Sequence, residues 1–347
     1  GAPRRRGYPH PEGGPVSTVE EERATEPVPE AILAGSPLAE LAESLPGERD
    51  PAAAGTRLWR AAVAEGGDDR PLYWARLRVR AAMRDKGVDP EPFELAARGM
   101  LEPPGAEVVL TAFDPYLLHE DIRRGNPSAA VALAYDGRVV AGRRIRAMIF
   151  PVRYAEFDAG LVERVLGPHA GRAEWIVTVS QGRPDQFDLE VWNGRRRSRT
   201  APDNAGELGG GTPENPVVPP GMPDGPEFVR ATLPFEAMAT DTGGAYPVHV
   251  NNTLTQLAPG GLPHEADAPA EGAIAVAGSG GGYLSNEIAY RNTLLLAGRA
   301  LGTRGGHVHT PALPVPPGNE LTGTEMAQAR ADIVAQFLDL LHHGLGQ

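Results

Sequence analysis

Trp175-Ile176-Val177-Thr178-Val179 is a run of mostly β-branched residues without polar alternation. Such a run is typical of a strand that is buried on both faces, as in the parallel sheets of α/β proteins. Comparable runs lie at residues 108–111, 246–250 and 306–310, and helical or turn-rich segments separate them. The pattern predicts a three-layer α/β/α sandwich with a mostly parallel central sheet, in which these runs are buried strands.

The character of the chain changes near residue 105, after two prolines and a glycine. We expect the α/β domain to occupy residues 105–347 and a helical extension to occupy residues 17–104. Residues 1–16 lack apolar periodicity, so their burial could not offset the entropy of ordering them. We therefore expect a flexible tail at residues 1–16.

Helix-start signals support the extension. Ser17-Thr18-Val19-Glu20 resembles a capping box, and Ser36-Pro37 places a cap and a first-turn proline before an apolar stripe. Residues 57–65 and 71–86 continue the helical pattern, so we expect roughly three or four short helices there. A further amphipathic helix is predicted for residues 322–343, packed on the sheet.

Two segments rich in Gly and Pro interrupt the α/β pattern. Residues 252–280 predict a long loop next to the serine segment described below, and residues 204–224 predict a surface excursion. Long loops of this kind are usually lids or disordered segments. We expect the first of them to lie beside the functional site.

The composition argues against several partners. The 347-residue chain has a formal net charge of −12, whereas nucleic acid and anionic membranes bind basic surfaces. We interpret Arg4-Arg5-Arg6 as part of a solvated tail and Arg195-Arg196-Arg197 as a solvated turn. No apolar run reaches the roughly 18 residues that span a bilayer. We expect neither nucleic acid nor a membrane as a partner.

The chain contains no cysteine, so disulfides, thiolate catalysis and cysteine-ligated zinc are excluded. The first residue is Gly1 rather than methionine, which we take as the sign of a removed signal peptide or tag. Both features favour an exported bacterial protein over a cytoplasmic one, while deliberate replacement of a reactive cysteine by serine stays open. Whether the chain forms a homo-oligomer also stays open.

Two segments near the C-terminus carry the residue types of an acyl-transfer site. Gly280-Gly281-Gly282 lead to Ser285 before a predicted helix, and His307 and His309 alternate on a predicted strand. Attack on an amide carbonyl requires a nucleophile, a base within reach and a group that fixes the tautomer of the base. Ser285 alone would more often be a helix cap. The two histidines share a strand face but lack a third ligand, so no metal site is predicted.

These segments resemble the pyroglutamyl peptidase I (pyrrolidone-carboxylate peptidase) family. In that family a cysteine stands just before an Asn that is followed four residues later by Tyr, and Ser285 takes the place of this cysteine. Val177 to Arg183 is similar to the family pattern Val-Gly-x-Ala-x-Gly-Arg. The other matching segments, in chain order, are Leu110 to Tyr116, Asn126-Pro127-Ser128, Pro202-Asp203-Asn204, Thr232-Leu233-Pro234, Asn251-Asn252 and Gly306 to Pro314.

The resemblance implies hydrolysis of the amide bond that follows an N-terminal pyroglutamyl residue of a small peptide, without a cofactor. It implies that Ser285 is the nucleophile, His309 the general base and Glu190 the group that orients the imidazole. Glu190 is favoured over Asp188, because the spacing to Pro202-Asp203-Asn204 agrees with the family from Glu190 onward. The resemblance also implies that four residues bind the substrate: Phe113, Tyr116, Asn126 and Arg183.

The serine leaves alternatives open, because a hydroxyl stays protonated until attack whereas a thiol can form a thiolate. One alternative is a noncatalytic relative that keeps the Phe113 and Tyr116 pocket as a binding module with a disabled nucleophile. Another is that the helical extension covers the site and regulates access to it.

Overall fold

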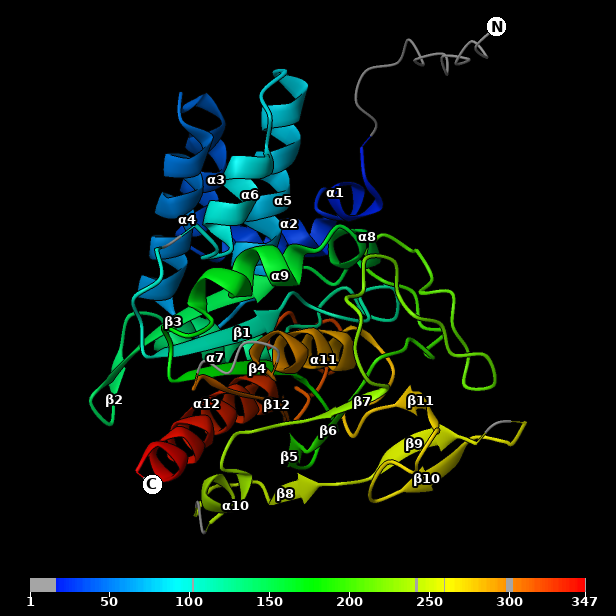
Figure 1. The fold of residues 1–347 in the computed structure, drawn as a ribbon. Coiled ribbons are helices and arrows are strands. Elements are labelled where there is room, and N and C mark those ends of the chain that lie inside the picture. The colour runs from blue at the N-terminus through cyan, green and yellow to red at the C-terminus, as the bar shows by residue number, and fades with distance from the viewer. Residues whose placement is uncertain (1–16, 102, 241–242, 259, 298–301, 347) are drawn as a thin grey trace, which may run out of the picture.

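A seven-stranded sheet forms the centre of the computed structural model, which describes residues 17–101, 103–240, 243–258, 260–297 and 302–346 (Figure 1). The predicted tail at residues 1–16 lies outside the described residues. In spatial order the strands are β2 (Val139–Val140), β3 (Arg143–Phe150), β1 (Val108–Phe113), β4 (Trp175–Gln181), β12 (Arg304–Thr310), β5 (Phe187–Glu190) and β8 (Val248–Asn251).

The sheet is mostly parallel, as predicted. β3, β1, β4 and β12 are parallel neighbours, whereas β5 runs antiparallel to β12 and pairs in parallel with β8. The run at residues 246–250 was expected to be a buried strand, and that expectation is wrong. β8 is an edge strand with exposed and half-exposed residues, because polar residues alternate with its valines.

Helices cover both faces of this sheet, which confirms the three-layer architecture. α7 (Pro127–Tyr135) and α12 (Thr324–Leu345) belong to the core on one face, and α9 (Leu161–Leu166) and α11 (Leu284–Ala297) belong to the core on the other. Successive residues of β1 point alternately to the two faces, so Leu110 contributes to the first core and Val109 to the second.

The described residues before the sheet form six α-helices and one 3₁₀ turn, rather than roughly three or four helices. The capping box uses Thr18 and Glu21, one residue later than expected. The helices are α1 (Val19–Arg23), α2 (Pro27–Ala34), α3 (Leu38–Ser44), α4 (Pro51–Glu65), α5 (Arg70–Asp85) and α6 (Glu91–Ala97), with η1 (Leu45–Gly47) between α3 and α4. Several of them span fewer than nine residues, too short for a clear periodic pattern.

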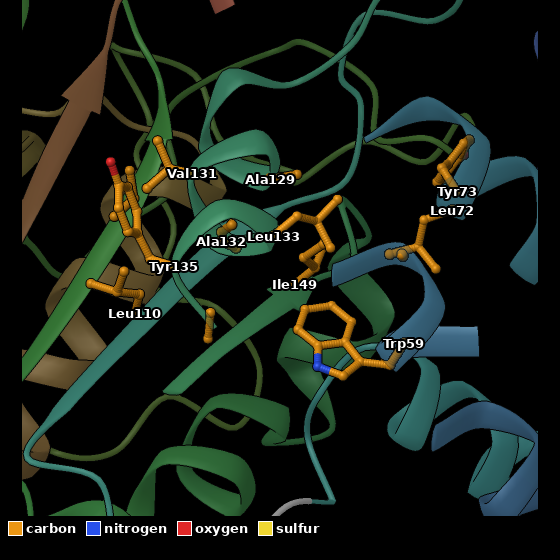
Figure 2. Close-up of a cluster of buried hydrophobic side chains, with 14 of the residues drawn as sticks. Trp59, Leu72, Tyr73, Leu110, Ala129, Val131, Ala132, Leu133, Tyr135 and Ile149 are labelled. Atoms are coloured by element: carbon orange, nitrogen blue, oxygen red, sulfur yellow. The ribbon is translucent and has the colours of Figure 1, made fainter. Parts of the chain in front are cut away.

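These helices share a core with the sheet. Figure 2 shows Trp59 of α4 next to Ile149 of β3, in the same buried cluster as Leu133 of α7. The indole nitrogen of Trp59 donates a hydrogen bond to Asp136 at 3.0 Å. The division at residue 105 stays a prediction, but the apolar burial on this face is continuous across it.

The segment at residues 252–280 was expected to be a structureless loop, and it instead holds a three-stranded antiparallel sheet. Its strands are β9 (Leu254–Leu257), β10 (His264–Ala266) and β11 (Ile274–Ala277). The strands are only three or four residues long and lie among Gly and Pro, so their alternation was hidden. Residues 204–224 contain neither helix nor strand, as predicted. In the described ranges, no helix is long and apolar enough to cross a membrane.

Asp69, at the start of α5, ties the extension to the α/β domain. Its Oδ2 atom accepts a hydrogen bond from the backbone N–H of Asn126 at 2.8 Å. Burial, followed by the neighbouring charge of Asp68, raises the pKa of Asp69 from 3.8 to about 7. Between about pH 4 and pH 7 the folded state therefore holds a proton that the unfolded state has lost. The contribution of Asp69 to stability must fall as the pH rises through this window.

We expect Asp69→Asn to remove this pH dependence of the unfolding free energy. The amide keeps an oxygen that can accept the hydrogen bond from Asn126, and it does not ionise. Relative to the variant, the wild type should lose roughly 2 to 4 kcal/mol of unfolding free energy between pH 4.5 and pH 8. Burial would raise the pKa of Asp68, but hydrogen bonds from Arg70 and the charge of Arg330 lower it, so its effect falls below this window. Urea unfolding at several pH values measures the difference, and parallel profiles for the two proteins would contradict the raised pKa.

Candidate active site

A cavity of about 410 Å³ opens where β1, β4 and β12 end. In open α/β sheets, ligands bind at the carboxyl ends of the strands, because the loops that follow converge there. All seven residues that the sequence singled out line this cavity: Phe113, Tyr116, Asn126, Arg183, Glu190, Ser285 and His309. Within the described residues its lining begins at Phe113, so the helical extension does not cover it.

His309 and Glu190 form a hydrogen-bonded pair between neighbouring strands. The Nδ1 atom of His309 lies 2.7 Å from Oε1 of Glu190, and both side chains are buried. A carboxylate at Nδ1 favours the tautomer with the proton on that atom, which leaves Nε2 as the proton acceptor. The other carboxylate oxygen of Glu190 accepts a hydrogen bond from Asn251 at 2.9 Å. The imidazole is therefore held in the orientation that a general base requires.

Ser285 lies in the first turn of α11, where backbone N–H groups lack partners within the helix. Its hydroxyl donates a hydrogen bond to the carbonyl of Gly280 at 3.3 Å, and in the described part of the chain it donates none to His309. Gly280 also adjoins the imidazole, because a Cβ atom at that position would lie 3.1 Å from Cε1 of His309. The hydroxyl and the imidazole are thus neighbours of the same glycine.

The turn before Ser285 depends on glycine. Gly281 has a φ of +93°, a conformation that L side chains rarely adopt. A Cβ atom at Gly282 would lie 2.0 Å from the hydroxyl oxygen of Ser198, which only a side-chain movement could relieve. Glycine at these two positions therefore lets the backbone connect β11 to α11 without strain at Gly281 or a clash at Gly282.

A buried ion-pair cluster around Glu287 anchors the first turn of α11. Glu287 is buried and accepts hydrogen bonds from Arg197 at 2.6 Å and from Arg291 at 2.9 Å. Arg197 also contacts Asp158 at 2.7 Å, and its guanidinium lies 4.6 Å from the ring centre of Tyr154. The interpretation of residues 195–197 as a solvated turn is therefore wrong for Arg197. Its carboxylate partners come from distant segments, so nothing local in the sequence indicated them.

Aromatic rings form one wall of the cavity. Phe113 stacks on Phe157 with ring centres 6.1 Å apart. Tyr116 lies against Tyr283 at 5.2 Å, and Tyr283 in turn meets Tyr154 edge to face at 5.6 Å. Burial raises the pKa of Tyr116, so its ring stays neutral. Sequence reasoning assigned no role to Tyr283, although it stands two residues before Ser285.

Asn126 and Arg183 occupy different parts of the cavity. The amide of Asn126 donates to the carbonyl of Asp114 at 2.9 Å and accepts from the hydroxyl of Ser128 at 2.7 Å, so both its ends are engaged. The Arg183 side chain is 60% exposed and lies 3.5 Å from Asp188. Asn126 thus shapes the cavity, and Arg183 places a positive charge at its rim. Arg199 is a second cation that lines the cavity, and it was not predicted from the sequence.

His307 is fully buried next to His309, with their ring centres 4.6 Å apart. Its two nitrogens lie 2.8 Å from the hydroxyls of Thr178 and Ser180. Burial and the neighbouring His309 lower the pKa of His307 well below its usual range, so it stays neutral. Among the described residues, no group of three His, Asp or Glu side chains is placed to hold a metal ion.

A family described as "PA0049, C-terminal domain" matches residues 107–223 and 245–314. The chain is 30% identical over 380 aligned residues to "Uncharacterized protein PA0049" of Pseudomonas aeruginosa, an alignment that covers 75% of this chain and 68% of that protein.

The chain is also 30% identical over 213 residues to the pyrrolidone-carboxylate peptidase of Chromobacterium violaceum, which covers 60% of this chain and 78% of that protein. Among solved structures, pyroglutamyl peptidase I of Bacillus amyloliquefaciens aligns with a TM-score of 0.48 and 18% identity, over 70% of this chain and 98% of its own.

Proposed function

Because the chain belongs to the PA0049 C-terminal-domain family and is related to the pyrrolidone-carboxylate peptidases, we propose that it hydrolyses the amide bond after an N-terminal pyroglutamyl residue or a related small lactam. The observation that carries this proposal is the hydrogen bond between Glu190 and His309 in the cavity that Ser285 also lines. A base with a fixed tautomer next to a hydroxyl is what acyl transfer by serine requires.

In the proposed reaction, the Ser285 hydroxyl turns from Gly280 toward the bound carbonyl, and Nε2 of His309 takes its proton as the oxygen attacks. The N–H groups at the start of α11 stabilise the oxyanion that forms. The imidazolium returns the proton to the leaving amine, and the C–N bond breaks. Water, deprotonated by the same imidazole, then hydrolyses the acyl-serine ester and releases the acid.

The substrate ring would lie against the aromatic wall. Phe113 and Tyr116 offer apolar surface for a five-membered lactam, and Asn126 keeps the loop between them in place through Asp114. Arg183 at the rim would face the peptide beyond the scissile bond. A small peptide with a blocked N-terminus fits this distribution of apolar and charged groups.

The second candidate is a binding protein that keeps the pocket without turnover. It is favoured by one observation, namely that the Ser285 hydroxyl donates to Gly280 and not to His309 in the described structure. A serine that stays in this arrangement with ligand bound would not be activated for attack.

The proposed activity is tested with two fluorogenic amides of the same leaving group, one pyroglutamyl and one prolyl. Release of the fluorophore from the pyroglutamyl amide alone supports a lactam-specific hydrolase, since the prolyl ring lacks the carbonyl and carries a charged amine. Binding of the pyroglutamyl amide without turnover supports the binding protein. If neither binding nor turnover occurs, both proposals fail.

We expect Asn251→Leu to lower kcat for the pyroglutamyl amide roughly 10- to 100-fold with KM little changed. The substitution leaves one buried oxygen of Glu190 without its hydrogen bond, and loss of a hydrogen bond to a charged group costs about 1.5 to 3 kcal/mol. Asn251 does not line the cavity, so its replacement removes no direct substrate contact; its second hydrogen bond, to the carbonyl of the lining residue Ser279 at 3.1 Å, is also lost. Steady-state kinetics measures kcat and KM separately, and Asn252→Leu, at the exposed neighbouring residue, is the matched control. A rise in KM at constant kcat would contradict a role through Glu190.

A further inference from the structure

Four polar side chains lie together on one face of the sheet beneath the cavity. β4 and β12 pair in parallel, with Thr178 opposite His307 and Ser180 opposite His309. Residues two apart on a strand point to the same face, so all four face the same layer. Three of them form a hydrogen-bonded chain that the proposed mechanism does not use: Thr178, His307 and Ser180.

The hydrogen-bonded series of Thr178, His307 and Ser180 reaches the cavity at Ser180. Ser180 lines the cavity and is 4% exposed, whereas His307 is 0% exposed and is hydrogen-bonded to Ser180. In the family pattern matched by residues 177–183, Gly and Ala stand at the positions of Thr178 and Ser180. Both hydroxyls that flank the imidazole are therefore departures of this chain from that pattern.

The hydrogen bonds indicate where the protons lie. The Thr178 hydroxyl has the carbonyl of Gly306 as an acceptor at 3.2 Å, which leaves its oxygen free to accept the Nδ1 proton of His307. Nε2 then carries a lone pair and accepts the Ser180 proton at 2.8 Å. Among the described residues, the hydrogen-bond partner of Ser180 Oγ is His307 Nε2, so donation to Nε2 satisfies the Ser180 proton within the protein.

We propose that Ser180 is a specificity-determining residue whose oxygen accepts a hydrogen bond from an N–H group of the bound ligand. Its own proton is committed to His307, so it presents only lone pairs to the cavity. His307 is a positioning residue, and Thr178 fixes its tautomer. The choice of a lactam or amide as the ligand rests on the proposed function, whereas the preference for an N–H donor rests on the three side chains.

The preference is measured with two ring compounds of nearly equal size, 2-pyrrolidone and cyclopentanone. Both carry a carbonyl, but only 2-pyrrolidone has an N–H, and cyclopentanone has no amide or ester bond to hydrolyse. Ligand-observed NMR titration gives the ratio of their affinities for the wild type and for Ser180→Ala. We expect the substitution to reduce the preference for 2-pyrrolidone roughly tenfold, because an unsatisfied buried N–H is costly.

An unchanged ratio overturns the proposal, and so does a wild type that binds neither compound. A second measurement needs no ligand: ¹⁵N NMR of the histidine rings reports the tautomer of His307. We expect the Nδ1–H tautomer, and an Nε2–H tautomer overturns the proposal, because Ser180 would then receive a proton instead of donating one. Neither measurement involves turnover, so failure of the proposed hydrolysis would be seen separately in the fluorogenic assay.

Discussion

Ser285→Ala is expected to lower the rate of pyroglutamyl amide hydrolysis roughly 10⁴-fold or more, because removal of a nucleophile leaves only binding and oxyanion stabilisation. Ser285 lies in the first turn of α11 and donates to the carbonyl of Gly280, and neither the aromatic wall nor the Glu190 and His309 pair depends on its hydroxyl. The substrate should therefore still bind. Steady-state kinetics together with direct binding of the uncleaved amide distinguishes loss of chemistry from loss of affinity.

His309→Ala is the matched variant for this test. The nucleophile and the base act as a unit, so the double variant should be little slower than either single variant. Multiplicative losses would mean that the two residues act independently. A loss of less than tenfold for Ser285→Ala would contradict the assignment of this serine as the nucleophile.

Arg98→Ala is expected to destabilise the protein by about 3 to 5 kcal/mol, since it removes one partner of a buried ion-pair network. Arg98 lies 2.9 Å from Asp114 and 3.0 Å from Glu94, and it donates to the carbonyl of Ile149 at 3.2 Å. Arg76 also contacts Asp114, at 2.8 Å. Asp114 directly follows Phe113, so the aromatic wall should loosen as well and ligand affinity should fall.

Arg164→Ala provides the control for Arg98. Its ion pair with Glu91 spans 3.4 Å, and the two side chains are 57% and 60% exposed. Exposed pairs of this kind contribute about 1 kcal/mol or less. Denaturant unfolding of both variants measures the contrast, and equal losses for the two would show that the buried network has no special weight. Arg98 would then not support the pocket loop through Asp114.

Sequence patterns predicted three strands of the central sheet, β1, β4 and β12, because these strands are long enough to show continuous burial. The run at residues 175–179 lies inside β4, and the run at residues 306–310 lies inside β12. The antiparallel sheet within residues 252–280 was missed, because strands of three or four residues carry too few alternations to be distinguished from a loop. The edge position of β8 was missed for a related reason, since valine at alternate positions resembles a buried strand until its polar neighbours are weighed.

The candidate site was predictable only where a motif marked it. Ser285, His309 and Glu190 were identified from spacing and resemblance, and the fold brings them to one cavity. Arg197 was misread, because burial of an arginine depends on carboxylates such as Glu287, 90 residues away in the chain. The hydrogen bonds between His307 and the hydroxyls of Thr178 and Ser180 were not predicted for the same reason. These side chains come within hydrogen-bonding distance only because β4 and β12, which are distant in sequence, pair with each other.

The clamped start of α11 determines how the pocket can respond to ligands. Glu287 anchors the first turn of α11 through two buried arginines, whereas the φ of +93° at Gly281 is a conformation that glycine adopts readily. The segment that carries Ser285 is therefore preorganised, and little conformational entropy remains to be lost when a ligand arrives. Adaptation to a ligand would therefore fall to rotation of the Ser285 side chain and to the exposed Arg183, and we expect closer selection of ligand shape near Ser285 than at the rim.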